Sequence, residues 1–309
     1  MRDKSEDSLE NIPMLWNTFL DTPPDEANLE TSEVVVVPFP YDSTTSYKTG
    51  SRLGPSSIIN ASKHLEDFDL ELRRDISEIG IHTRPEIKPD ISGPKAMVDL
   101  VRRTIVPIVK SGKFPVLLGG EHTITTGAIQ AVTEVLSDVS VLYFDAHADL
   151  RNDFMGSCWG HASVARRLYE ICPLVHVGLR SCAAEELKFI RDKQLPVFFW
   201  GPPDGTVDIN KLASAILEHL SSQVYISIDL DVLDPSIMQA VGTPEPGGIL
   251  WHEITTLLKL ISNERKIIGF DVTELSPPEG PEACSYLAAK LVYKLIGYSK
   301  RPENIRQHT

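Results

Sequence analysis

The sequence predicts an α/β protein with a parallel sheet. Short apolar segments rich in β-branched residues recur along the chain, and segments with helical character lie between them. Most apolar segments are continuous rather than alternating, as expected of strands that helices cover on both faces. This repeated β-α order fits both a closed eight-stranded barrel and an open sheet, and the pattern alone leaves both possibilities open.

Eight strands and eight helices are expected from these segments. The four consecutive valines from Val34 predict the first strand, and the later strands follow from similar apolar runs. Pro94 near the start of one helix and Gly112 at its end fit the usual punctuation of helices. In chain order, strands and helices alternate at residues 34–37, 55–62, 76–81, 93–111, 114–118, 122–136, 139–144, 160–172, 174–177, 183–193, 195–200, 208–221, 224–228, 251–262, 266–272 and 280–298.

The composition is that of a globular protein with a large core. The chain has 309 residues, of which 42% are hydrophobic and 24% charged. No internal repeat or Gly/Ser-rich linker divides it, which predicts one domain at residues 32–309 behind an acidic N-terminal arm at residues 1–31. No apolar run reaches the roughly 18 residues of a membrane span, and residues 1–7 lack the apolar stretch of a signal peptide. We therefore expect a cytoplasmic protein that does not interact with membranes.

Charge and cysteine content narrow the function classes further. The formal net charge is −13 and no lysine or arginine cluster is present, which argues against nucleic-acid binding and suits a cationic substrate. The four cysteines include no Cys-x-x-Cys pair, so they are expected to be reduced thiols.

A run of three metal-ligand residues follows the predicted strand at residues 139–144. Asp145, His147 and Asp149 are spaced two apart, and side chains two apart on an extended chain lie on the same face. Two carboxylates held close together raise each other's pKa unless a positive charge lies between them. The motif therefore indicates a cation site.

Two further strands end in residues of the same type. His122 follows the apolar run at residues 114–118, and Asp229 and Asp231 follow the run at residues 224–228. Parallel sheets bind their ligands beyond the carboxyl ends of the strands, so the three loops are expected to meet at one edge. Four acids and two histidines suit manganese, zinc or iron, and a bridging acid holds two such ions about 3.5–4 Å apart. The sequence thus predicts a binuclear hydrolytic site.

Four motifs follow one another along the chain: Gly-Gly-Glu-His at residues 119–122, Asp-Ala-His-Ala-Asp at 145–149, Ser-Ile-Asp-Leu-Asp-Val-Leu-Asp-Pro at 227–235 and Gly-Thr-Pro-Glu-Pro-Gly-Gly at 242–248. Taken in this order, they resemble those of the ureohydrolases, the family of arginase and agmatinase, which hydrolyse guanidino groups to urea and an amine. The resemblance runs from about residue 33 to residue 298. It implies an open three-layer α/β/α sandwich with a parallel, mainly eight-stranded sheet, and so decides against the barrel.

The resemblance also implies two Mn²⁺ ions per subunit and a ligand set for each. One ion is expected to be held by His122, Asp145, Asp149 and Asp229. The other is expected to be held by Asp145, His147, Asp229 and Asp231, so that Asp145 and Asp229 are shared. Family members are commonly trimers or hexamers, which implies a homo-oligomer.

Four residues acquire a role in the reaction from the same resemblance. A metal-bridging hydroxide is expected to attack the guanidinium carbon while Asp149 orients it and transfers its proton to the leaving amine. His161 matches the active-site histidine of the family, which shuttles protons. Glu274 is expected to bind the planar guanidinium through two hydrogen bonds, and Thr243 to contact the substrate.

The residues after the Asp-x-His-x-Asp run bear on the substrate. Their pattern, Leu150-Arg151 followed by Gly156 and then His161, resembles agmatinase rather than arginase, and agmatine yields putrescine and urea. Residues 236–240 and Trp159 depart from the family pattern, which leaves guanidinobutyrate, N1-aminopropylagmatine and arginine as alternative substrates.

Two other functions use similar residues. A two-metal phosphoesterase needs basic groups opposite the metals, and Arg151 and Lys48 are the nearby candidates. A non-catalytic homologue typically lacks a ligand or the active-site histidine, whereas this sequence retains all of them.

Overall fold

The computed structural model describes residues 15–23, 25–201 and 207–300. Its main sheet has eight strands, all paired in parallel, in the order β4-β1-β5-β10-β9-β6-β7-β8. The first and last strands of this order do not pair with each other, so the sheet is open and the barrel is excluded. The strands are β1 (Val34–Phe39), β4 (Ile81–Thr83), β5 (Phe114–Gly119), β6 (Val139–Phe144), β7 (Leu174–Leu179), β8 (Val197–Phe199), β9 (Gln223–Asp229) and β10 (Lys266–Thr273).

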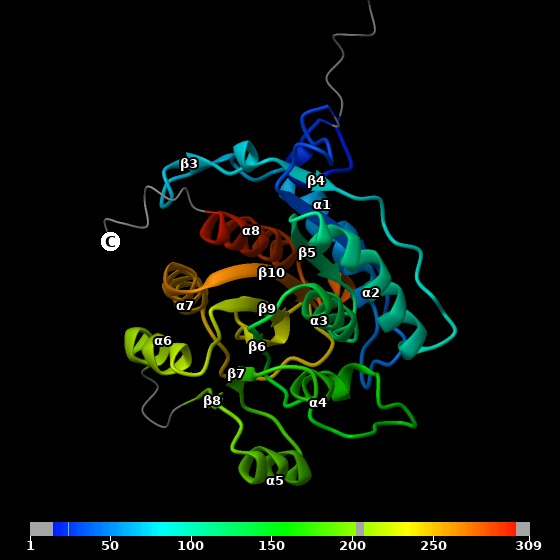
Figure 1. Ribbon diagram of the computed structural model, residues 1–309, viewed down its shortest axis with the longest axis vertical. Helices are drawn as coiled ribbons and strands as arrows, with labels where there is room; N and C mark the ends of the chain where they lie inside the picture. The colour runs from blue at the N-terminus through cyan, green and yellow to red at the C-terminus, as the bar shows by residue number, and fades with distance from the viewer. Residues whose placement is uncertain (1–14, 24, 202–206, 301–309) are drawn as a thin grey trace, which may run out of the picture.

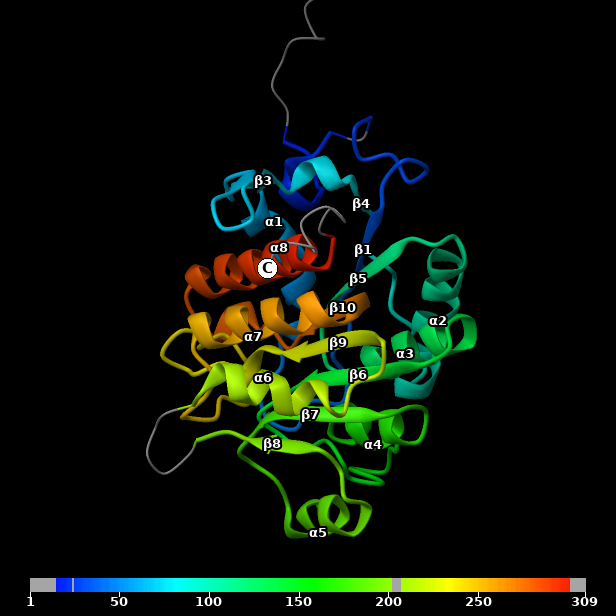
Figure 2. The ribbon, with the colours of Figure 1, turned by 60° about the vertical axis from the view of Figure 1, so that its left-hand side comes forward.

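Helices cover both faces of the sheet (Figures 1 and 2). They are α1 (Gly54–Ser62), α2 (Pro94–Lys110), α3 (Ile124–Val135), α4 (Val164–Tyr169), α5 (Ala184–Lys193), α6 (Ile209–Leu217), α7 (Trp251–Glu264) and α8 (Glu282–Ser299). With the sheet seen nearly edge-on in Figure 2, α1, α8, α7 and α6 lie on one side and α2, α3 and α4 on the other. The fold is therefore the expected three-layer α/β/α sandwich.

Each face of the sheet forms its own core with the helices that cover it. Val34 and Val36 of β1 belong to the core beneath α1, α8, α7 and α6, whereas Val35 and Val37 belong to the core beneath α2, α3 and α4. All four side chains are fully buried. Burial on both faces explains why the strands are continuous apolar runs in the sequence.

The prediction for residues 76–81 was wrong. Ser77–Ile79 form a 3-10 helix, and strand β4 begins only at Ile81. A two-stranded hairpin, β2 (Phe68–Asp69) and β3 (Arg74–Asp75), precedes it and was not expected. The helix expected at residues 160–172 is shorter, because it starts with a 3-10 turn at His161–Ser163 and α4 ends at Tyr169.

The acidic arm lies only partly within the described residues. Residues 1–14 and 24 are outside them. Phe19 and Leu20 form a short 3-10 turn with Asp21 and are buried in the core beneath α1, α8, α7 and α6. Leu15, in contrast, is exposed. Among the described helices, none is long and apolar enough to cross a membrane.

The strand order brings the predicted site residues together. The chain places β5, β10, β9 and β6 side by side at the centre of the sheet, although they are far apart in sequence. Because all four are parallel, the loops that follow them leave the same edge of the sheet. These loops carry the residues of the candidate site.

Candidate active site

A cavity of about 190 Å³ opens at the carboxyl ends of the central strands. It is lined by residues at or beyond the ends of six different strands, and these include every residue predicted to belong to the site. The predicted residues are His122 after β5, Asp145, His147, Asp149 and His161 after β6, Asp229 (the last residue of β9), Asp231 and Thr243 beyond it, and Glu274 after β10.

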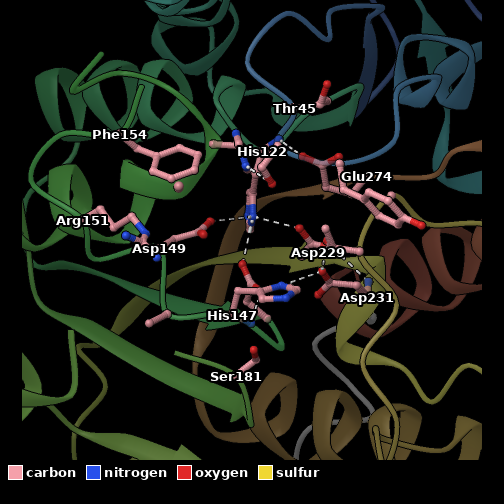
Figure 3. Close-up of a pocket in the computed structure, with 18 of the residues that line it drawn as sticks. Thr45, His122, His147, Asp149, Arg151, Phe154, Ser181, Asp229, Asp231 and Glu274 are labelled. Atoms are coloured by element: carbon pink, nitrogen blue, oxygen red, sulfur yellow. Dashed lines mark hydrogen bonds and ion pairs between the residues drawn. The ribbon is translucent and has the colours of Figure 1, made fainter. Parts of the chain in front are cut away.

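His122 lies at the centre of the first group of acids (Figure 3). Its Nδ1 atom is 3.2 Å from Asp145 Oδ2, 3.7 Å from Asp149 Oδ2 and 3.3 Å from Asp229 Oδ2. The ligand atoms of His122, Asp145 and Asp149 all lie within 4.8 Å of one another. This spacing suits one bound metal ion.

His147 lies at the centre of a second group. Its Nδ1 atom is 2.9 Å from Asp231 Oδ2 and 3.7 Å from Asp145 Oδ1. The ligand atoms of Asp145, His147 and Asp231 again lie within 4.8 Å of one another. Asp145 thus belongs to both groups, while Asp229 lies close to His122 and accepts a hydrogen bond from the Asp231 backbone N–H at 2.9 Å.

Two lone pairs face each other in the first group. The Ser227 hydroxyl donates to Asp271 Oδ1 at 2.7 Å and lies 2.8 Å from His122 Nε2. Because its one proton is used for Asp271, the hydroxyl accepts the proton of Nε2, and His122 Nδ1 is left with a lone pair. The neighbouring Asp145 Oδ2 is buried and has no hydrogen-bond partner. Two acceptors at this separation need a cation between them. The donor set, imidazole with carboxylates, therefore fits a transition-metal ion.

The electrostatics of the cluster also favour positive charge. Burial raises the pKa of Asp145 and of Asp229, and the charge of Asp231 raises both further. Burial and the charge of Asp145 raise the pKa of Asp149. Burial alone would lower the pKa of His147, but the charge of Asp231 and its hydrogen bond outweigh burial and raise that pKa to about 10. A divalent ion placed among these groups relieves the repulsion.

Tyr143 contacts the first group, although nothing in the sequence pattern predicts a tyrosine there. This residue is the fifth of the buried strand β6, and its hydroxyl donates to Asp149 Oδ2 at 2.8 Å. Its ring stacks on His122 with the centroids 4.6 Å apart. Ser227, which bonds to His122, and Asp271, which accepts from Ser227, were also missed. The available signal was a polar residue within the apolar run of each strand, β9 and β10.

His161 faces the cavity from the start of the 3-10 turn that precedes α4. Burial and the nearby His147 and His122 rings lower the pKa of His161 to about 4, so the imidazole is neutral near neutral pH. Its Nδ1 lies 3.1 Å from Thr44 Oγ1 and its Nε2 lies 3.2 Å from Ser46 Oγ. A neutral imidazole held in this way can accept or pass on a proton.

Glu274 and Thr243 each contact one of the predicted metal ligands. Glu274 Oε1 accepts a hydrogen bond from the His122 backbone N–H at 2.7 Å. Burial raises the pKa of Glu274, and the charge of Glu121 raises it further, so a cation bound beside it favours the ionised form. The Thr243 hydroxyl donates to Asp231 Oδ2 at 3.2 Å.

Two of these acids occupy left-handed backbone conformations. Asp149 has φ +50° and Glu274 has φ +65°. Such conformations cost on the order of 1 kcal/mol for residues with a side chain, and they concentrate at functional sites. Both residues line the cavity.

Comparisons with known proteins agree with this geometry. The model of the arginase family matches residues 32–297. An N(1)-aminopropylagmatine ureohydrolase of Synechocystis sp. is 40% identical over 86% of this chain and 88% of its own length. An agmatinase of Pyrococcus horikoshii is 33% identical over 89% of this chain and 94% of its own length.

A solved structure has the same architecture. The agmatine ureohydrolase of Thermoplasma volcanium superposes with a TM-score of 0.82 at 30% identity, covering 95% of this chain and 97% of that one. The chain is therefore a member of the arginase family, hydrolases that act on guanidino compounds.

Proposed function

We propose that this protein releases urea from the guanidino group of an agmatine-type amine, and that N1-aminopropylagmatine is its preferred substrate, with agmatine second. The observation that carries the activity is the pair of His/Asp groups that share Asp145 within one cavity. The order of preference follows the relatives, because an aminopropylagmatine ureohydrolase is 40% identical to the chain and an agmatinase 33%.

The proposed metal ligands are those that the sequence predicted, with Mn²⁺ as the proposed ion. His122, Asp145, Asp149 and Asp229 are proposed to hold one ion, and Asp145, His147, Asp229 and Asp231 the other. When bound, two such ions lower the pKa of a water molecule and so provide a nucleophile near neutral pH. The short distances from His122 Nδ1 and His147 Nδ1 to these carboxylates support the assignment.

The substrate groups have matching partners in the cavity. We propose that Glu274 forms a charge-assisted pair with the guanidinium and holds its carbon near the metal ligands. Thr243 and His161 are proposed to contact the substrate as well. Asp149 is proposed to pass a proton to the leaving amine, and the neutral His161 to exchange protons between the cavity and solvent.

The cavity rim does not resemble a phosphate site. The two basic residues on it already have acidic partners, since Lys48 pairs with Glu279 and Arg151 Nη1 lies 3.4 Å from Glu185 Oε1. Phosphoryl transfer requires a cationic side chain that is available to the phosphate opposite the metal ions. Both cations on this rim are paired with acids instead. The proposed substrate, a cation, instead suits the acids of the cavity floor.

Urea release from four guanidino compounds tests the proposal. Purified protein loaded with Mn²⁺ is assayed with N1-aminopropylagmatine, agmatine, guanidinobutyrate and arginine. We expect turnover of the first two, in that order of kcat/KM, and little turnover of the two carboxylates. Asp145→Asn should abolish urea release, whereas the exposed α5 variant Asp192→Asn should not change it. Absence of urea from both amines would contradict the proposal.

The remaining expectations are proposals from the family resemblance. We propose a homo-oligomer, a trimer or hexamer, located in the cytoplasm. Light scattering coupled to size-exclusion chromatography tests the assembly, and a monomer at micromolar concentration would refute it.

A further inference from the structure

Two buried acids hold the loop at residues 42–50, because Asp42 bonds across the loop and Glu121 bonds the loop to the residues that follow β5. Asp42 is 3% exposed and accepts hydrogen bonds from the Gly50 N–H at 2.9 Å and the Arg52 N–H at 3.0 Å. Glu121 is fully buried at the end of β5. The loop between these anchors carries Thr44 and Ser46, the two hydroxyls nearest to the His161 ring.

Four hydrogen-bond donors converge on the Glu121 carboxylate. Its Oε2 atom accepts from the Ser43 and Thr44 backbone N–H groups, both at 2.7 Å. Its Oε1 atom accepts from the Thr44 hydroxyl at 2.8 Å and from the Thr123 hydroxyl at 2.6 Å. Backbone amides can only donate, so the carboxylate acts here as an acceptor and fixes where the Thr44 hydroxyl proton points.

The direction of that proton determines what Thr44 can do for His161. A hydroxyl has one proton, and this one is directed at Glu121, so Thr44 Oγ1 can only accept from the histidine. It accepts the His161 backbone N–H at 3.0 Å and lies 3.1 Å from His161 Nδ1. The ring nitrogen facing Thr44 therefore carries the proton, and Nε2 keeps its lone pair.

The packing around Thr44 holds it close to Gly160 and His161. A Cβ atom on Gly160 would lie 3.0 Å from Thr44 Oγ1 and 3.1 Å from Thr44 Cβ, so a side chain before His161 would push the threonine away by a few tenths of an ångström. The His161 ring is held on another side by an edge contact with Phe154 at 6.0 Å between centroids.

We propose that Glu121 and Thr44 are positioning residues that hold His161 in its Nδ1–H tautomer, so that Nε2, which lies 3.2 Å from the Ser46 hydroxyl, keeps a lone pair that can take up a proton during the reaction. This inference rests on the proposed function, in which His161 exchanges protons with the cavity. Glu121 acts through Thr44 and does not itself touch the substrate.

Steady-state kinetics test the positioning role. Thr44→Val keeps the side-chain shape but removes the acceptor. We expect kcat to fall about tenfold, which is less than the roughly 10²–10⁴-fold contribution of acid–base catalysis because only the positioning of His161 is lost, with little change in KM. Thr44→Ser should restore most of kcat. Glu121→Gln, which turns a donor toward the loop amides, should lower kcat as Thr44→Val does. Thr133→Val, which removes a hydroxyl bonded within α3, serves as the matched control.

NMR provides a readout that does not depend on turnover. In full-length, metal-free protein labelled with ¹⁵N-histidine, we expect His161 to show its proton on Nδ1, with the signal assigned by its loss in His161→Gln. In Thr44→Val the proton should move to Nε2. An unchanged tautomer in Thr44→Val would overturn the proposal. So would a loss of kcat that Thr44→Ser fails to restore and that is accompanied by a lower melting temperature of the variant. If the wild-type protein releases no urea, the proposed function fails while the NMR result still decides the tautomer.

Discussion

The Ser227 hydroxyl lies between two buried groups, His122 and Asp271, and forms a hydrogen bond with each. It accepts the proton of His122 Nε2 and donates its own to Asp271, so that the three residues fix which histidine nitrogen faces the acids. Such outer partners orient metal-binding histidines, and their loss typically reduces metal affinity about 10–100-fold. Burial raises the pKa of Asp271, whereas the Ser227 hydrogen bond lowers it.

Replacing this serine should therefore weaken metal binding without abolishing the fold. We expect Ser227→Ala to reduce Mn²⁺ affinity by about 10–100-fold, measured by competition with a chelator. Ser140→Ala is the matched control, because Ser140 is also a fully buried strand serine but bonds to the Ser221 amide, far from the histidine. Equal affinities for the two variants would contradict the role given to Ser227.

Glu274 supports a second prediction at the residue scale. Replacing one member of a buried charge pair costs about 2 kcal/mol or more, which corresponds to at least about a thirtyfold loss. We expect Glu274→Gln to lower kcat/KM for N1-aminopropylagmatine by at least about this factor. The exposed α7 variant Glu264→Gln should leave kcat/KM unchanged. A phosphoesterase would not need Glu274, so an unaffected Glu274→Gln variant would argue against guanidinium binding there.

At the scale of elements, a charge network fastens the β2–β3 hairpin to α7 and α8. Glu71 accepts from Lys294 and from the Tyr298 hydroxyl, both at 2.8 Å, and pairs with Lys259 at 2.8 Å. Burial alone would raise the pKa of Glu71, but these hydrogen bonds outweigh burial and lower it to about 2. The hairpin is thus held by a carboxylate that stays ionised in moderate acid.

This network predicts how stability depends on pH. The folded pKa of Glu71 lies below its ordinary value of 4.5, so its contribution is present above pH 4.5 and is lost as the pH falls toward 2. Because Glu71 is partly exposed, we expect Glu71→Gln to lower the free energy of unfolding at pH 7 by only about 1 kcal/mol. Urea denaturation at pH 7 and pH 3 should show this difference shrinking in acid. The exposed Glu78→Gln variant should show neither effect.

The elements differ in how well the sequence predicts them. The strands β5, β6, β9 and β10 were found because continuous apolar runs mark strands covered on both faces. The edge strand β4 was misplaced because it has only three residues, Ile81–Thr83, and follows a 3-10 turn with similar apolar content.

The residues of the site also differ in how well the sequence predicts them. The ligand-type residues were identified because they follow the apolar runs at residues 114–118, 139–144 and 224–228, and those after the last two runs are spaced two apart. Tyr143, Thr44 and Ser227 were not identified, because hydroxyl groups are common in strands and loops, and their role depends on a neighbour that is distant in sequence. Strand order, which decides those neighbours, cannot be read from a local pattern.

At the scale of the whole molecule, the site draws acids from separate loops into one buried cluster. The loops after β5, β6, β9 and β10 meet there, and burial raises the pKa of Asp145, Asp149 and Asp229. Folding the metal-free chain therefore brings carboxylates together against their own repulsion. A bound divalent ion reverses that cost and ties four central strands together, so metal binding and global stability are linked.

We therefore expect Mn²⁺ to raise the melting temperature of the metal-free protein. Free ion at a hundred times its Kd adds about 2.7 kcal/mol per independent site, which amounts to several degrees for a domain of this size. The same concentration of Mg²⁺ should have a smaller effect, because imidazole ligands suit manganese better than magnesium. Asp145→Asn, which removes the carboxylate common to both groups, should lose most of the Mn²⁺-induced shift, whereas Asp192→Asn should retain it. An equal shift in both variants, measured by calorimetry, would mean that the stabilising ion binds elsewhere.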